Sequence, residues 1–167
     1  MKEEFLIYLW AQKLLNTDLY VQDNSTITIL NPGYRNHDSG PDFFNARIKI
    51  ASEIWAGNIE IHVKSSDWNK HGHSNDKAYD NIILHVVYDD DSPVKRTNGQ
   101  LIECLEIKHN FNHEILDKYL DFISARTWIA CENMISRIGH FELHNWLDCL
   151  TIERLENRTQ DILTKLN

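Results

Sequence analysis

The chain has 167 residues, which suits one domain or one domain with an appendage. Hydrophobic residues make up 42% and charged residues 25%, as in a soluble globular protein. No apolar run approaches the roughly 20 residues of a membrane helix, so we expect no membrane partner. The formal net charge of -8 argues against a general nucleic-acid coat protein, because phosphate binding depends on lysine and arginine. The acidic excess lies outside the segment from Arg35 to Lys77, where basic and acidic residues balance.

Two features predict a cytoplasmic protein. The amphipathic N-terminal segment carries two acids and lacks both the basic region and the small-residue cleavage site of a signal peptide. The cysteines are widely spaced and form no CxxC pair, so we expect buried free thiols in a reducing compartment. They are Cys104, Cys131 and Cys149.

Hydrophobic periodicity predicts a helix and three strands in the first 64 residues. We expect the second and third strands to pair in antiparallel fashion, because the hairpin-like connection over residues 51–57 leaves no room for a crossover helix. The predicted elements are a helix at Glu3–Asn16 and strands at Thr26–Leu30, Phe44–Ile50 and Asn58–Lys64.

The following segment is polar and rich in histidine, and it predicts a loop with a short helix at Asp67–Tyr79. Asn81–Tyr88 is almost continuously apolar, which is typical of a central strand buried on both faces. Leu101–Lys108 predicts a further strand. The fold class is therefore mixed α/β, of the α+β type with a mixed sheet, in the order helix, three-stranded meander, strand and C-terminal helices.

From Phe111 onward the apolar spacing is helical, so we divide the chain into a core at residues 1–110 and a helical extension at 111–167. The last helix reaches Asn167 with no closing glycine or proline, which predicts that the natural protein continues or that the helix is an arm. Exposed apolar residues such as Ile162 or Leu166 would mark a contact with a protein partner or a second copy.

One strand carries an unusual polar face. Glu60, His62 and Lys64 alternate along Asn58–Lys64 and therefore project together, while Asp42 opens the preceding strand. Two carboxylates can hold Mg²⁺ or Mn²⁺, so we assign Asp42 and Glu60 as metal ligands. Lys64 would stabilise developing charge, and His62 would be a further ligand or base. The plain alternative is a solvated strand face with a Glu60–Lys64 surface pair.

Pro41-Asp42 and Glu60-Ile61-His62, 18 residues apart, resemble the signature of the PD-(D/E)XK nuclease-like superfamily. The resemblance implies a nuclease-like core and metal-dependent hydrolysis of nucleic-acid phosphodiesters. The chain departs from the signature because His62 replaces its lysine and Lys64 lies two residues further along. Alternatively, His62 and Lys64 occupy the two signature positions and Glu60 is displaced. A competing interpretation is a catalytically degenerate module that binds protein or nucleic acid.

The histidines support a third interpretation, a metal hydrolase of another substrate. Together with His62, the accessory residues named at the end of this paragraph offer nitrogen and oxygen donors for Zn²⁺ or Mn²⁺. Zn²⁺ is less expected, because no spacing matches a zinc signature. The alternative to a metal site is that the loop histidines are solvated and that one further histidine is a hydrogen-bonded core residue. An intermediate interpretation is that the loop histidines cover the Asp42/Glu60 pair and supply a base. The accessory residues are Glu4, His71, His73, Asp76, Asp80 and His85.

Two aromatic residues near these motifs, Trp68 and Tyr79, are candidates for stacking on bases of a substrate, with core packing as the alternative.

Longer stretches of the chain resemble a bacterial family of the Bacteroidetes type, catalogued as domain of unknown function 2851. The resemblance covers about Phe5 to Lys108 and implies kinship without an assigned activity. It lies in NPGYRNHDSGPDFFNARI, in AGNIEIHVKSSDWNKHGHSNDKAYDNIILHVVY and in the following Asn98-Gly99.

Overall fold

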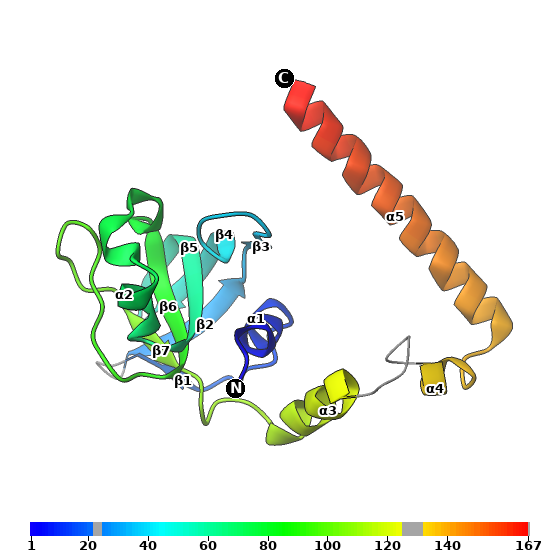
Figure 1. Ribbon diagram of the computed structural model, residues 1–167, viewed down its shortest axis with the longest axis horizontal. Coiled ribbons are helices and arrows are strands. Elements are labelled where there is room, and N and C mark those ends of the chain that lie inside the picture. Colours follow the sequence, from blue (N-terminus) through cyan, green and yellow to red (C-terminus); the bar gives the residue numbers. More distant parts are fainter. Residues whose placement is uncertain (22–24, 125–131, 167) are drawn as a thin grey trace. The chain divides into compact units, whose positions relative to one another are not determined.

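The structure is a computed structural model that describes residues 1–21, 25–124 and 132–166 (Figure 1). It forms two compact units, Met1–Tyr119 and Leu120–Asn167, and each is described by itself. The elements in chain order are α1 (Glu3–Ala11), β1 (Leu19–Tyr20), β2 (Thr26–Asn31), β3 (Tyr34–Arg35), β4 (Phe43–Ile50), β5 (Glu53–Lys64), α2 (Asp67–Lys70), the 3₁₀ turns η1 (His73–Asn75) and η2 (Lys77–Tyr79), β6 (Ile82–Asp89), β7 (Cys104–Glu106), α3 (His113–Ser124), α4 (Glu132–Ile135) and α5 (His140–Leu166).

The first unit contains a mixed sheet, which confirms the predicted fold class at the level of α+β. Across the described residues the strands follow the order β1-β2-β4-β5-β6-β7, and β3 pairs with β4 beside this path. The β2–β4–β5 meander is antiparallel, as predicted for the two motif strands, whereas β6 is parallel to both β5 and β7. β6 is thus the interior strand that its apolar sequence predicted.

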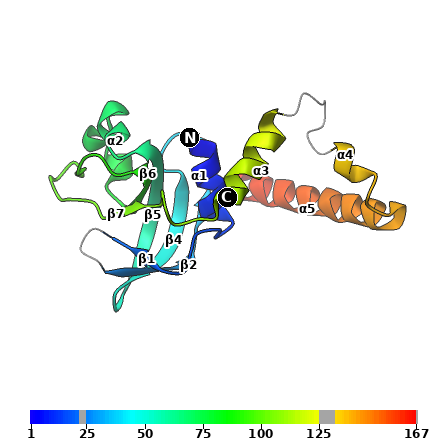
Figure 2. The same ribbon diagram turned by 90° about the horizontal axis from the view of Figure 1, so that it is seen from below.

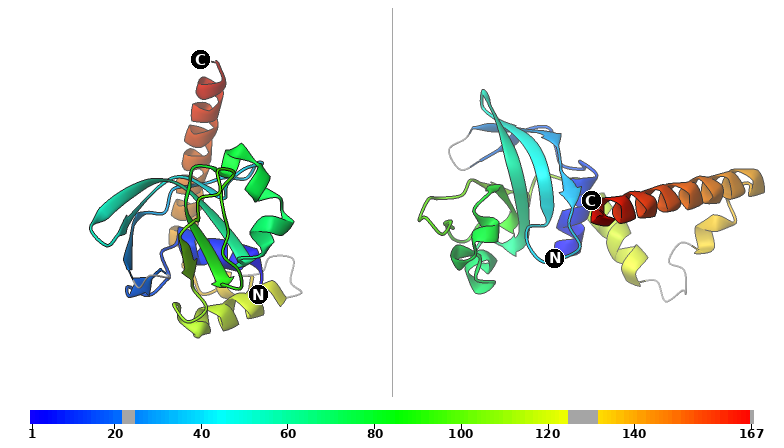
Figure 3. Two further views of the ribbon diagram at one scale, coloured as in Figure 1. Left: turned by 90° about the vertical axis from the view of Figure 1, so that its left-hand side faces the viewer. Right: turned by 90° about the horizontal axis from the view of Figure 1, so that it is seen from above.

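The β4–β5 hairpin is tighter than predicted, because its turn consists of Ala51 and Ser52 rather than of residues 51–57. The tip of this hairpin extends from the sheet in Figure 3 (left, teal). Gly57 lies inside β5, where a β-carbon would stand 2.4 Å from a methyl group of Ile83. The glycine therefore permits close approach of β6 and does not mark a turn.

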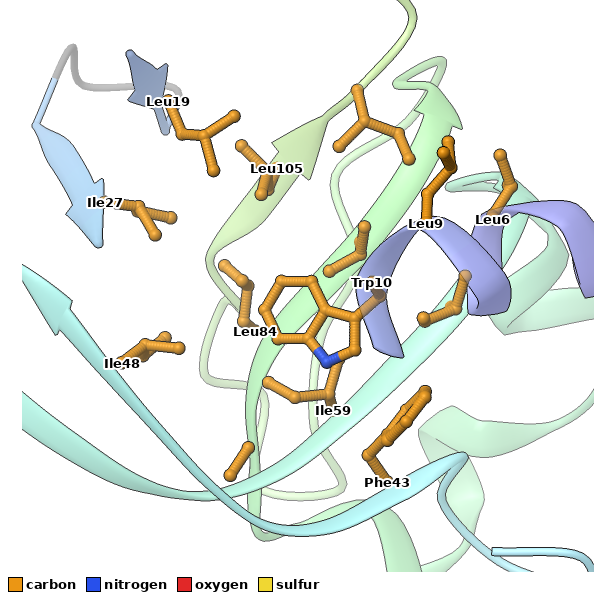
Figure 4. Close-up of a cluster of buried hydrophobic side chains, with 14 of the residues drawn as sticks. Leu6, Leu9, Trp10, Leu19, Ile27, Phe43, Ile48, Ile59, Leu84 and Leu105 are labelled. Carbon is orange, nitrogen blue, oxygen red and sulfur yellow. The ribbon is translucent and has the colours of Figure 1, made fainter. Parts of the chain in front are cut away.

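α1 and the β5–β6 connection cover opposite faces of the sheet (Figures 2 and 3). On the α1 side, Trp10 lies among apolar side chains of neighbouring strands, including Ile59 and Leu84 (Figure 4). The Trp10 indole N–H also donates to the Pro32 carbonyl over 3.0 Å, which fixes the helix on the sheet. α1 is shorter than the predicted Glu3–Asn16, because Lys13 has a φ of 52° and the chain turns there.

Two predictions, one about a strand and one about the cysteines, need correction. The strand expected at Leu101–Lys108 is limited to β7, since Leu101 makes only an isolated bridge to Lys95. Cys104 is a buried free thiol as expected, but Cys149 is exposed on α5. Cys131 lies outside the described residues.

The second unit is helical over most of its described residues, as predicted for the end of the chain. α5 is 27 residues long and mainly exposed; Ile162, for example, retains 55% of its accessible surface. The side chain of Leu166 lies outside the described part. No helix described in the structure has both the length and the apolar character needed to cross a membrane.

Candidate functional site

Three polar side chains lie side by side in the middle of the sheet, on the face opposite α1. Glu60 and His62 alternate with Ile59 and Ile61 along β5, so the isoleucines enter the core under α1 while the acid and the histidine face the connection to β6. His85 comes from β6, where it pairs in register with Glu60. All three side chains are buried, so the polar face of β5 is not the solvated surface of the plain alternative.

The β5–β6 connection places two more histidines over this face. His71 ends α2 and His73 begins η1, and the residue between them, Gly72, has a φ of 80°. This left-handed conformation reverses the chain within one residue, at little cost because glycine has no β-carbon. The histidine-rich segment is therefore an ordered cover that carries donor atoms to the sheet.

Four side chains, Glu60, His62, His71 and His73, form what we call the histidine–carboxylate cluster. His62 Nε2 lies 3.0 Å from His71 Nδ1, and Glu60 Oε1 lies 3.2 Å from His73 Nε2 and 3.6 Å from His62 Nε2. One ring nitrogen from each histidine falls within 4.8 Å of the others. His71 is exposed and the other three are buried, so the cluster is closed on the sheet side and open on the His71 side.

Two more carboxylates adjoin the cluster. Asp42 and Glu60 are joined reciprocally: the Asp42 N–H donates to Glu60 Oε2 over 3.2 Å, and the Ile61 N–H donates to Asp42 Oδ2 over 2.9 Å. Glu3, in the first turn of α1, places Oε1 4.0 Å from His62 Nε2. The sequence had suggested Glu4, but that residue is exposed and Glu3 is the one beside the histidines.

The electrostatics of the site are unusual because three acids are gathered beside buried histidines, and Arg35 offsets only part of their repulsion at Asp42. Burial, followed by repulsion from Glu60, raises the pKa of Asp42 to about 7. Burial also raises the pKa of Glu3 to about 7, with Asp42 and Glu60 adding to the effect. Burial and the neighbouring histidines lower the pKa of His62 to about 2, so this imidazole is neutral. The site therefore holds one neutral nitrogen donor, His62, and two carboxyl groups, Glu3 and Asp42, that a cation would help to ionise.

His73 supplies a further indication that the cluster is built for a ligand. Its Nε2 is buried and has no hydrogen-bond partner among the described residues, although Glu60 Oε1 lies 3.2 Å away. The two atoms are near each other but are not aligned for a hydrogen bond, as expected when both face a common third atom. A buried polar atom without a partner calls for an explanation, and a bound cation supplies one.

The two candidate substrate-stacking residues, Trp68 and Tyr79, lie behind the histidines. Tyr79 stacks on His73 with 3.7 Å between ring centroids, and Trp68 is fully buried against His73 and His85. The Trp68 indole donates to the Lys95 carbonyl. In this structure both rings support the histidines from within the protein.

Three other predicted residues lie apart from the cluster. The Lys64 ammonium is exposed and lies 3.9 Å from Asp91. Asp76 accepts from the Ala78 N–H and caps η2, and Asp80 accepts from the backbone and hydroxyl of Thr97. The aspartates thus stabilise the connection that carries His71 and His73.

The spacing of the donor atoms fits a single cation. Imidazole and carboxylate ligands lie about 2.0–2.2 Å from Zn²⁺, so any two ligand atoms on one ion stand about 2.9–4.3 Å apart. The distances of 3.0, 3.2, 3.6 and 4.0 Å among His62, His71, Glu60, His73 and Glu3 fall within this range. The three histidine nitrogens lie within 4.8 Å of one another, so a shift of about 0.5 Å would bring them onto one ion. The residues present can therefore hold one cation of the Mn²⁺ to Zn²⁺ series with little rearrangement.

The sequence identified most of this donor set, and one of its interpretations already had the loop histidines covering the Asp42/Glu60 pair. Alternation along β5 placed Glu60 and His62 together, and the Pro-Asp motif pointed to Asp42. Nothing in the sequence showed that His71 and His73 fold back onto the same strand, because that follows from the path of the β5–β6 connection. Glu3 was missed because a helix turns 100° per residue, and which of two consecutive acids faces the sheet depends on docking.

The chain belongs to the family described as Protein of unknown function (DUF2851), whose model it matches over residues 3–167. No curated protein and no solved structure matches the chain.

Proposed function

We propose that this protein is a metal-dependent hydrolase of phosphodiesters and that the histidine–carboxylate cluster binds its catalytic cation. The observation that carries the proposal is the convergence of His62, His71 and His73 on Glu60, with one side closed by the sheet and the other open. Catalytic metal sites have this form, because protein ligands fix the ion and an open position admits water or substrate.

The donor set favours a transition metal over Mg²⁺. Mg²⁺ prefers oxygen ligands and retains water, whereas imidazole suits Zn²⁺, Fe²⁺ and, together with carboxylates, Mn²⁺. Because the imidazole of His62 is neutral, it can bind a cation without first losing a proton. Of the cations expected from the sequence, we therefore propose Mn²⁺ or Zn²⁺ and no longer Mg²⁺.

The chemistry follows from this arrangement. A bound cation lowers the pKa of water and polarises a phosphoryl oxygen. Glu3 and Asp42 lie next to the cluster, and a bound cation would favour their ionised forms, which can accept a proton. Glu3 is 38% exposed and its Oε1 lies 4.0 Å from His62 Nε2, so we assign it as the group that accepts the proton of the attacking water.

The choice of nucleic acid as substrate rests on the PD-(D/E)XK-like motif. Asp42 precedes β4 and Glu60 lies on the adjacent β5, with the two residues hydrogen-bonded as neighbours. His62 stands at the signature's lysine position, and Lys64 lies beside Asp91. We propose that the cation, held by His62, supplies the positive charge that the lysine supplies in that superfamily.

A second candidate function, a non-catalytic binding module, is favoured by the second unit. Several large apolar residues of α5 are exposed, Trp146, Leu155 and Ile162 among them. Exposed apolar side chains in such number are typical of interaction surfaces. This candidate predicts partner binding through α5 and no cation at the cluster.

One set of measurements separates these possibilities. Untagged protein is analysed for bound metal, then stripped with chelator and titrated with Mn²⁺, Zn²⁺ and Mg²⁺. Cleavage of DNA, RNA and bis(p-nitrophenyl) phosphate is followed with each ion. We expect tight binding of Mn²⁺ or Zn²⁺, phosphodiester cleavage with one of them, and loss of both in His73→Ala and Glu60→Gln.

His109→Ala is the matched control, since His109 is an exposed histidine outside the cluster. Wild-type protein that binds none of these ions would overturn the proposal. Tight metal binding with hydrolysis of other esters alone would overturn the phosphodiester assignment and favour the hydrolase of another substrate.

A further inference from the structure

A buried contact between two histidines lies directly behind the cluster. His62 Nδ1 and His85 Nε2 are 2.8 Å apart, and the two rings meet edge to face. His85 is fully buried, and burial lowers its pKa to about 3, so both rings are neutral. A neutral imidazole carries one proton, so one ring donates and the other accepts.

Metal binding at His62 determines which ring donates. If His62 Nε2 binds the cation, that nitrogen must offer its lone pair, and the ring proton must reside on Nδ1. His62 Nδ1–H can then donate only to His85 Nε2, which in turn must be unprotonated. His85 therefore carries its own proton on Nδ1 when the site is loaded.

The metal-free arrangement is expected to be the opposite. His85 Nδ1 is buried and has no hydrogen-bond partner among the described residues. A buried N–H without an acceptor is less favourable than a bare acceptor nitrogen. Without metal, His85 thus keeps its proton on Nε2 and donates to His62 Nδ1, and His62 Nε2–H donates to His71 Nδ1 over 3.0 Å.

We propose that His85 is a positioning residue that accepts from His62 Nδ1–H when the cation is bound and so orients the His62 ring. Loading the site shifts the proton of each ring from Nε2 to Nδ1, and each ring keeps one proton throughout. The inference rests on the proposed metal site and extends it to a residue that does not touch the metal.

Two variants test the acceptor role of His85. In His85→Gln the amide oxygen reaches the position of the ring Nε2 and can accept from His62 Nδ1–H. In His85→Leu no acceptor is present. Outer-shell partners of metal-binding histidines change affinity by about 10–100-fold, and we expect a loss of this size for Zn²⁺ in His85→Leu, near wild-type binding in His85→Gln, and no change in the control His109→Leu.

Nitrogen-15 NMR of the imidazoles in the wild-type chain tests the proton positions without any substitution. We expect Nε2–H on His62 and His85 in chelator-treated protein and Nδ1–H on both after Zn²⁺ is added, with His85→Gln used to assign the signals. This readout serves even if His85→Leu does not fold, a point that circular dichroism checks.

The outcomes are distinct. Wild-type protein that binds no Zn²⁺ overturns the proposed metal site and this inference with it. Zn²⁺ binding that is equal in all the variants overturns the role of His85 alone, as does a His85→Gln variant that is as weak as His85→Leu. Loaded protein with Nε2–H on His62, or free protein that already has Nδ1–H on both rings, overturns the proton shift.

Discussion

Asp42 carries an energetic cost that metal would remove. Its pKa lies near 7 in the folded chain against an ordinary value of 3.8, because it is buried and faces Glu60. Between these two values the folded chain binds more protons than the unfolded chain, so Asp42 lowers the stability of the metal-free protein progressively as pH rises from about 4 to 7. His62 acts in the opposite sense below its ordinary value of 6.5, since its lowered pKa costs stability as pH falls.

The first prediction isolates the contribution of Asp42. Asp42→Asn keeps an acceptor for the Ile61 N–H and removes the charge, so it should stabilise the metal-free chain at pH 8 by about 1–2 kcal/mol, a value reduced for partial exposure, with the difference vanishing near pH 4. Urea denaturation with chelator present measures this. Asp38→Asn, at an exposed position in the preceding turn, should change little at any pH. Equal effects at pH 4 and pH 8 would rule out the carboxylate repulsion.

Individual residues were predictable from sequence where strand alternation decides their direction. Glu60 and His62 share a face of β5 for that reason, and they lie on the face opposite the isoleucines. Burial of that face was not predictable, because it depends on a cover formed by a later part of the chain. Likewise, Glu3 joins the site through the docking of α1, which no local pattern encodes.

At the level of elements, the cluster is assembled from a rigid part and an adjustable part. At Glu60 and His62, β5 pairs with β6, and the Ile61 N–H between them donates to Asp42, so both side chains are fixed by the backbone of the sheet. His71 and His73 depend on the turn at Gly72, where a β-carbon would meet open space, with no atom beyond the adjoining residues within 4 Å. Conformation alone, and not crowding, requires glycine there.

The second prediction concerns this turn. Gly72→Ala should lower the affinity for Mn²⁺ or Zn²⁺ several-fold and destabilise the fold by about 1 kcal/mol, because alanine resists positive φ, whereas Gly72→Asn should be milder. Isothermal titration and thermal melting report the two effects. Gly99→Ala is the matched control, since Gly99 has a φ of 84° and equally open surroundings. Affinity losses that are equal at both glycines would show that the turn has no special part in the site.

Element prediction succeeded for the strands with regular alternation and failed where tertiary packing decides the ends. β2, β4 and β6 lie within one or two residues of their predicted bounds. Gly57 was taken as a connection residue, yet it lies within β5, where a β-carbon would meet Ile83 and the Asn81 carbonyl. α1 ended early because the chain turns at Lys13, whose ammonium donates to the Leu30 carbonyl.

At the scale of the whole molecule, the first unit has its own hydrophobic core, as an independent domain does. Its larger core cluster lies between α1 and the sheet, and the first turns of α3 complete it through Ile115, Leu116 and Tyr119, with the ring of Tyr119 4.9 Å from that of Phe5. All proposed ligands lie within Met1–Tyr119.

The third prediction is that a chain ending at Ser124 folds and binds metal as the whole chain does. We expect its Zn²⁺ or Mn²⁺ affinity to stay within about threefold of the full-length value, because no proposed ligand is removed. Circular dichroism and metal titration measure this. An unfolded fragment, or one that folds without binding metal, would show that the second unit contributes to the site.

The fourth prediction concerns the second unit. With Trp146, Leu155 and Ile162 exposed on α5, the full chain should self-associate in a concentration-dependent way in sedimentation experiments, while the chain ending at Ser124 stays monomeric. Leu155→Glu should weaken the association without changing metal affinity. A full-length chain that remains monomeric up to millimolar concentration would leave a different protein as the partner for α5.

The division of ligands between a strand and the connection that follows it has a consequence for local opening of the fold. A cation held by β5 and by His71 and His73 would act as a staple that closes the loop between two parallel strands. Amide hydrogens in residues 67–79 should then exchange with solvent much more slowly when metal is bound, while those of β6 and the paired part of β5, already protected by the sheet, should change little. The cation would thus make the connection over residues 67–79 exchange together with the sheet.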